Sequence, residues 1–144
     1  MMQRNKYLDE LGLNIKDYGT NRINEENTER SKRWEEQRQL YGFDDRETWS
    51  LDVYFAEWLY SHLMMYKEYA GEVINLKFYK FTWDNKEITQ LEAIDMLINA
   101  AKDYILAEDK YMRSIIPSEK VELIYDKFYK LMPLWGMILP HMWW

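Results

Sequence analysis

The sequence has no cysteine, few glycines and prolines, and no long uninterrupted apolar run. Without cysteine there is no disulfide, thiolate nucleophile or cysteine-ligated zinc site. The 5 glycines and 3 prolines exclude collagen-like and linker-like chains, and the glycines are too scattered to form a phosphate-binding loop. The first residues do not resemble a signal peptide, and the apolar stretch 134–144 is short and broken by proline. We therefore expect a soluble, cytoplasmic protein that does not bind or cross a membrane.

Basic charge is also scarce. The chain has 25 Asp and Glu residues against 19 Lys and Arg, which gives a formal net charge of −6. Basic residues do gather within 30–38, but glutamates alternate with them, so this pattern indicates a solvated helix face. A duplex-binding protein needs a basic stripe to neutralise phosphates. We therefore expect no binding to duplex DNA.

Aromatic residues, in contrast, are abundant. The 144 residues are enough for one ordinary domain, and 7 Trp, 12 Tyr and 5 Phe make up 17% of them. Trp and Tyr bury large areas and keep one polar end, so they suit protein cores and interfaces equally. We favour a core built largely on aromatic rings.

Apolar periodicity and capping signals predict an all-α fold, a compact bundle of about four main helices. A first, satellite helix over 27–41 ends at Gly42, which occupies the position of a C-cap glycine. A central helix over 45–70 carries apolar residues at steps of three and four, and Asp44 is placed to cap it. These two predicted helices are followed by two more.

The third and fourth helices have clear starts, whereas the segment before them is ambiguous. Thr89 and Glu92 form a capping box that opens the third helix, and the fourth begins near Pro117 and ends before residue 133. Residues 72–88 are rich in β-branched and aromatic residues, with a turn signal at 84–85. One short strand within 73–81 is an option, but it lacks an obvious partner, so we favour an extended connector.

The chain divides into a polar N-terminal arm over 1–27 and a single helical domain over 28–144. The arm carries only scattered apolar residues and has room for one short helical turn. An arm of this kind is ordered only if it docks on the body of the protein or on a partner.

Acidic residues cluster at the start of the predicted central helix, at Asp44, Asp45, Glu47 and Asp52. Helix capping accounts for Asp44 and Glu47 without any catalytic role. A catalytic carboxylate pair needs one acid with a raised pKa in a cleft, and the sequence identifies no such pair. Asp52, if buried, needs a donor such as Arg46 or a Trp indole N–H.

His62 and His141 are the only histidines. Trp58 and Tyr66 stand one turn before and after His62, so no carboxylate accompanies it as a metal ligand. We favour a core histidine that hydrogen-bonds to a nearby acid or carbonyl. His141 is predicted to pack locally or to lie at the surface. Two isolated histidines and no cysteine predict no metal site, and we expect no cofactor.

One sequence pattern resembles a known family. Residues 45–52 read D-x-x-T-W-x-L-D within the longer stretch 33–60, Lys67-Glu68 match a K-x-x-E-like run at a helix end, and the chain ends in Trp143 and Trp144. This combination resembles an uncharacterised family of small phage and prophage proteins of gut bacteria. The resemblance implies a viral origin and a compact helical fold. It implies no activity, substrate or catalytic residue.

The final apolar segment needs a covering surface, because it places more apolar area at one end of the chain than a monomer should expose. In the interpretation we favour, Trp143 and Trp144 close the helical core. In the other, Trp135, Trp143 and Trp144 contact a partner or a second copy, as tryptophans often do at interfaces.

Two functional hypotheses remain. The first is a non-enzymatic interaction protein that binds a host or viral protein or itself, as an inhibitor, adaptor or small virion accessory in the host cytoplasm or the virion. The second is a small enzyme or nucleic-acid-processing factor that uses Asp45, Asp52 and His62. The two hypotheses differ in whether those three side chains converge in one cleft.

Overall fold

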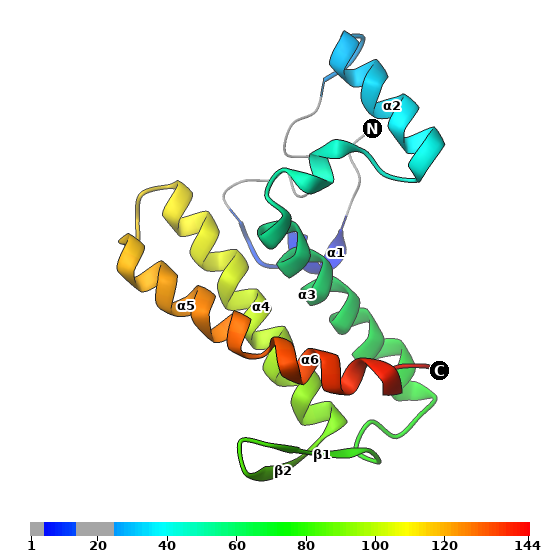
Figure 1. Cartoon of the computed structure of the whole chain (residues 1–144), viewed down its shortest axis with the longest axis vertical. Coiled ribbons are helices and arrows are strands. Elements are labelled where there is room, and N and C mark those ends of the chain that lie inside the picture. The colour runs from blue at the N-terminus through cyan, green and yellow to red at the C-terminus, as the bar shows by residue number, and fades with distance from the viewer. Residues whose placement is uncertain (1–4, 14–24) are drawn as a thin grey trace.

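A computed structural model describes residues 5–13 and 25–144 of the chain, and they form a helical fold with one short strand pair (Figure 1). The principal helices are α2 (Glu29–Tyr41), α3 (Leu51–Tyr69), α4 (Gln90–Met112), α5 (Ser118–Lys130) and α6 (Met132–Ile138). The predicted helical bundle is therefore confirmed. No helix of the described ranges is long and apolar enough to cross a membrane.

The core lies between α3 and α4 and extends under α5 and α6. α4 packs against α3, α5 and α6, while α3 also receives the short helix α1 (Lys6–Asp9). Fully buried residues such as Leu59, Leu97 and Phe128 come from three of these helices. The centre of the bundle is thus shared by α3 and α4, whereas the sequence suggested a single central helix.

Capping residues place several helix ends where the sequence predicted them. The Thr89 hydroxyl accepts a hydrogen bond from the Glu92 backbone N–H at 3.1 Å, which opens α4. Gly42 ends α2 with φ of 84°, a left-handed conformation that glycine adopts without strain. α5 begins directly after Pro117.

The start of the central helix is a correction. Residues 45–48 form a 3-10 turn, Asp45–Thr48, and α3 begins only at Leu51. The Asp44 carboxylate does act as a cap, but it accepts the Arg46 backbone N–H and so caps the 3-10 turn. Ser50 then interrupts the helical conformation with φ of −122° and ψ of 70°. The sequence pattern does not separate the 3-10 turn from α3, because both segments are rich in helix-compatible residues.

The segment before α4 is a hairpin, so the predicted option of a short strand is right, although β1 begins only at Lys80, and the favoured extended connector is wrong. β1 (Lys80–Trp83) pairs with β2 (Lys86–Thr89) in antiparallel register. The predicted turn at Asp84 and Asn85 is right, and both residues have positive φ, 49° and 60°. The strand partner was missed because it lies inside the capping region of the next helix.

The described part of the N-terminal arm docks on the body. Tyr7 and Leu8 of α1 are buried in the main core, and the Tyr7 hydroxyl donates a hydrogen bond to Glu68 of α3 at 2.6 Å. These contacts anchor α1 to the body of the protein. Residues 1–4 and 14–24 of the arm lie outside the described residues.

α2 is the satellite helix that the sequence predicted, and Figure 1 places it at one end of the molecule, away from the C-terminus. Trp34, 2% exposed, is its buried anchor. The Trp34 ring meets the Trp49 ring edge-on at 6.2 Å, and its indole N–H donates to Asp45 at 3.0 Å. This small cluster is separate from the main core.

Candidate functional site

The last segment of the chain has one buried side and one exposed side. Leu134 and Ile138 of α6 are fully buried, and Trp135 is half-buried against the core. A 3-10 turn, Leu139–His141, follows α6, as expected from Pro140. The segment is therefore tied to the bundle by its aliphatic residues.

Trp143 and Trp144 do not close the core, which corrects the interpretation favoured from sequence. Their exposed fractions are 68% and 62%. The helix α6 ends at Ile138, and the residues of this segment that are fully buried in the core are Leu134 and Ile138. The two indoles thus present apolar surface to solvent.

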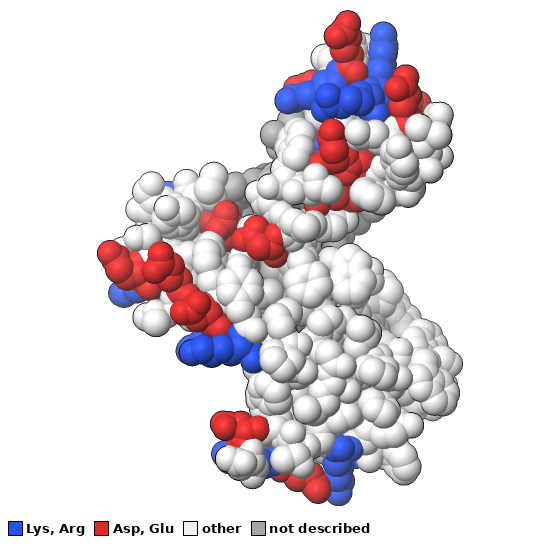
Figure 2. All heavy atoms as spheres, viewed as in Figure 1, with Lys and Arg blue, Asp and Glu red and all other residues white. Residues whose placement is uncertain are grey.

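The chain segment that carries these exposed indoles has no charged side chain. Residues 131–144 contain no Lys, Arg, Asp or Glu, and 53–66 of α3 contain one such residue, Glu57, which is buried. Figure 2 shows a broad surface without charged side chains over α3 and α6, with charged side chains gathered on α2, on α5 and near the hairpin. We call the surface formed by 53–66 and 131–144 the uncharged face.

Trp58 adds an aromatic stack to the uncharged face. The Phe55 and Trp58 rings stack at 6.3 Å, and the Trp58 and His62 rings stack at 4.2 Å. His62 is exposed, so the prediction of a core histidine is wrong, although its Nδ1 lies 2.7 Å from the Trp58 carbonyl oxygen. The helical spacing of one turn brings these rings together on one side of α3.

Asp52 takes part in a tyrosine network that the sequence did not reveal. The buried Tyr104 of α4 donates a hydrogen bond to Asp52 at 2.5 Å, and the Tyr129 hydroxyl of α5 lies 2.6 Å from that of Tyr104. Burial, and then the hydrogen bond to Asp52, raise the pKa of Tyr104 far above its ordinary value. The donor to Asp52 is thus a tyrosine, and not the arginine or tryptophan considered from sequence.

Tyr125 extends the network. Its ring stacks on the Tyr104 ring at 4.2 Å, and its hydroxyl donates to the Glu108 carboxylate. Burial and this hydrogen bond raise the pKa of Tyr125 above its ordinary value. Since the Tyr104 and Tyr125 hydroxyls stay protonated and each donates to an acid, the network links α3, α4 and α5 and serves packing.

Asp44 forms the most enclosed charged group among the described residues. Its carboxylate, with a side chain at 0% exposure, receives Arg38 at 2.7 Å and Arg46 at 2.8 Å. Burial raises the pKa of Asp44, but the hydrogen bonds and charge of Arg46 and the charge of Arg38 outweigh burial and hold it below the ordinary value. The Arg46 guanidinium also lies 4.1 Å from the Trp34 ring. This arrangement joins α2 to the turn before α3.

Asp45, Asp52 and His62 do not share a site. Asp45 binds Trp34 and Gln37 of α2, Asp52 binds Tyr104 of α4, and His62 stacks on Trp58. Each of the three side chains thus has its own environment, and this geometry does not favour the hypothesis of an enzyme built on them.

Metal ligands also fail to gather in the part of the chain that the structure describes, where no group of three His, Asp or Glu residues is placed to hold an ion. The expectations that the protein needs no metal, has no cofactor and does not bind duplex DNA stay predictions. His141 is half-buried and lies against the hairpin rings of Tyr79 and Phe81, at 4.8 and 5.5 Å.

Comparison with known proteins adds no relative: the chain matches no protein-family model, no curated protein sequence and no solved structure. The resemblance to small phage and prophage proteins therefore stays a prediction.

Proposed function

We propose that this chain is a non-enzymatic helical interaction protein that binds a host or viral protein, with Trp135, Trp143 and Trp144 in contact with the partner. In this proposal it is of phage or prophage origin and acts as an inhibitor, an adaptor or a small virion accessory in the bacterial cytoplasm or the virion.

The observation that carries the proposal is the exposure of two consecutive tryptophans, Trp143 and Trp144, on a segment without charged side chains. Exposed contiguous apolar surface marks interaction sites on soluble proteins. Tryptophan is enriched among the residues that contribute most binding energy at protein interfaces. Met137 and Leu139 of the same segment are also exposed and add to its apolar area.

The buried part of the segment explains why the indoles would suit a partner contact. Leu134 and Ile138 hold α6 on the bundle, and Met142, directly before the two tryptophans, packs partly buried against the core. An anchored aromatic side chain loses little conformational freedom on binding, which favours affinity.

The test compares two matched double variants in affinity capture from a bacterial lysate, with quantitative mass spectrometry. Trp143→Ala/Trp144→Ala removes the exposed pair, and Leu40→Ala/Tyr41→Ala removes two equally exposed adjacent apolar side chains at the remote end of α2. We expect a protein captured by the wild type to be retained by the α2 variant and reduced about tenfold or more by the tryptophan variant. Equal retention by both variants would contradict the proposal.

Sedimentation velocity distinguishes self-association from binding to another protein. If the partner is a second copy, the wild type shows a concentration-dependent dimer that the tryptophan variant lacks. If the partner is a different protein, both sediment as monomers and only capture differs.

A further inference from the structure

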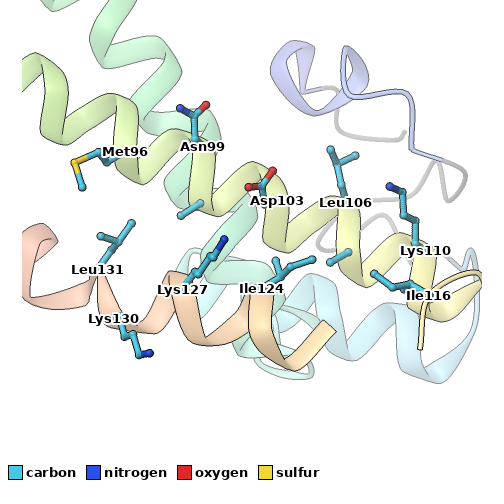
Figure 3. Close-up of a pocket in the computed structure, with 12 residues that line it drawn as sticks. Met96, Asn99, Asp103, Leu106, Lys110, Ile116, Ile124, Lys127, Lys130 and Leu131 are labelled. Atoms are coloured by element: carbon cyan, nitrogen blue, oxygen red, sulfur yellow. The ribbon is translucent and has the colours of Figure 1, made fainter. Parts of the chain in front are cut away.

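A groove of about 740 Å³ runs between α4 and α5 (Figure 3). The α4 residues that line it recur at alternating steps of three and four, at Met96, Asn99, Asp103, Leu106 and Lys110, with the buried Ala100 and Ala107 beside them. This is the heptad spacing of a helix face that packs against another helix. The facing wall has the same step size, with Ile124 and Lys127 in α5 and Leu131 directly after it.

The shape of the groove suits a third helix. Ala100 and Ala107 are buried, so the apolar side chains that a third helix can contact are the half-buried Met96, Leu106 and Ile124. From Met96 to Lys110 the groove follows α4 for roughly 21 Å, or about four helical turns. Met96 and Leu131 lie at one end in Figure 3, and Ile116 lies beside Lys110 at the other.

The charges along the groove are mainly positive, although the whole chain is acidic. Lys110, Lys127 and Lys130 line it with one acid, Asp103. Within the described ranges none of these four side chains has an ion-pair partner. The neighbouring acid Asp109, in contrast, is paired with Arg113 at 2.8 Å. In Figure 3 Lys127 extends from α5 toward α4, whereas Lys130 points away from α4.

We propose that the groove between α4 and α5 accepts an amphipathic helix of a partner protein, with its apolar stripe against Met96, Leu106 and Ile124 and its flanking Asp or Glu residues against Lys110 and Lys127. The lysines stand on different turns at different points along the groove, which matches a helix with several acids. An anionic amphiphile with a single acyl chain has one charged head group. It can therefore pair with Lys110 or Lys127, but not with both. This surface is separate from the tryptophan pair and goes beyond the function proposed above.

The test uses fluorescence anisotropy with a labelled, stapled helical peptide of about 14 residues. The peptide has Leu at its a and d positions and Glu at its e and g positions, and the control peptide has Lys in place of Glu. We expect the acidic peptide to bind at least about tenfold more tightly than the basic one, and more weakly as salt rises.

Two charge-reversal variants locate the peptide. Lys110→Glu/Lys127→Glu should weaken binding of the acidic peptide at least about tenfold, because both flanking contacts become repulsive. Lys77→Glu/Lys102→Glu makes the same change of net charge at exposed lysines that do not line the groove, and should stay within about twofold of wild type. All four lysines are exposed, so circular dichroism should show both variants folded.

Several outcomes would overturn the proposal: no binding of the acidic peptide, equal binding of both peptides, or equal loss in both variants. Displacement of the peptide by laurate at lower concentration than by unlabelled peptide would assign the groove to an anionic amphiphile instead. Loss of peptide binding in Trp143→Ala/Trp144→Ala, with the groove variant unaffected, would assign the peptide to the chain end. The failure of one proposal is thus distinguishable from the failure of the other.

Discussion

At the scale of single residues, Tyr104 is the polar group that most tightly joins three helices. The change Tyr104→Phe keeps the ring but removes the hydroxyl that bridges Asp52 and Tyr129. We expect the free energy of unfolding, measured by urea denaturation at neutral pH, to fall by about 1–2 kcal/mol. Tyr111→Phe, at an exposed tyrosine, serves as the control and should be neutral. Equal stability of Tyr104→Phe and wild type would show that the network is not stabilising.

Asp44 gives a prediction with a defined pH dependence. The change Asp44→Asn removes the charge that pairs with Arg38 and Arg46, and at neutral pH it should cost about 2–3 kcal/mol of unfolding free energy. Since the folded-state pKa of Asp44 lies below the ordinary 3.8, its contribution is present above that value and is lost as pH falls through the folded pKa.

Urea denaturation at neutral pH and below pH 4 therefore checks the sign: the gap between wild type and Asp44→Asn should narrow in acid. Asp95→Asn removes an exposed ion pair with Lys67 and should change stability by less than about 0.5 kcal/mol. If the difference in unfolding free energy between wild type and Asp44→Asn widened in acid, the stabilising role of the charged Asp44 carboxylate would be contradicted.

Residue identity predicted local roles better than distant partners. The capping role of Asp44 follows from its place before a helical segment, and the structure confirms it for a 3-10 turn. The partner of Asp52 could not be predicted, because Tyr104 is 52 positions away in the sequence. The prediction of a buried His62 is wrong for a similar reason. The exposure of His62 depends on which elements pack against α3, and no local sequence pattern specifies them.

At the scale of elements, the hairpin turn is sensitive to substitution because its two residues have positive φ. Asn85 has φ of 60°, a left-handed conformation that asparagine tolerates and alanine does not. We expect Asn85→Ala to lower the unfolding free energy by about 1 kcal/mol and Asn85→Gly to retain or raise it. Thermal unfolding of the two variants measures the difference. Equal unfolding free energies of Asn85→Ala and Asn85→Gly would contradict the left-handed conformation of residue 85.

The two sides of the last segment should respond differently to truncation. Leu134→Ala removes a fully buried side chain and should cost about 2–5 kcal/mol. Trp143→Ala/Trp144→Ala removes exposed side chains and should change the unfolding free energy by less than about 0.5 kcal/mol. Denaturant unfolding of both variants tests this. A large loss in the tryptophan variant would restore the view that the indoles close the core.

Helix boundaries with strong local signals could be read from the sequence, and tertiary placement could not. The ends of α2 and α4 follow from Gly42, Thr89 and Glu92, which act within one turn. The hairpin was missed because β2 is only four residues long and its last residue also caps α4. The sequence does not predict that α3 and α4 share the centre of the bundle. Periodicity shows that a helix has a buried face, but not how many other helices pack against that face.

At the scale of the whole molecule, the fold separates a charged end from an uncharged face. α2 and the Asp44 cluster lie at one end, and the exposed tryptophans lie on a charge-free segment supported by the main bundle (Figures 1 and 2). Composition showed the excess of aromatics, but it could not divide them between core and surface. Tyr104 and Phe128 are buried in the core, while Trp143 and Trp144 are exposed to solvent.

Site-specific photo-cross-linking in bacterial cells tests the central claim most directly. A photoreactive phenylalanine analogue replaces Trp144 in one variant and Tyr41, exposed at the far end of the molecule, in the other. We predict one dominant cross-linked protein from position 144, which unlabelled wild-type protein suppresses by competition, and no such product from position 41. No competable product at position 144, or the same product at both positions, would contradict the claim that the exposed tryptophans bind a partner.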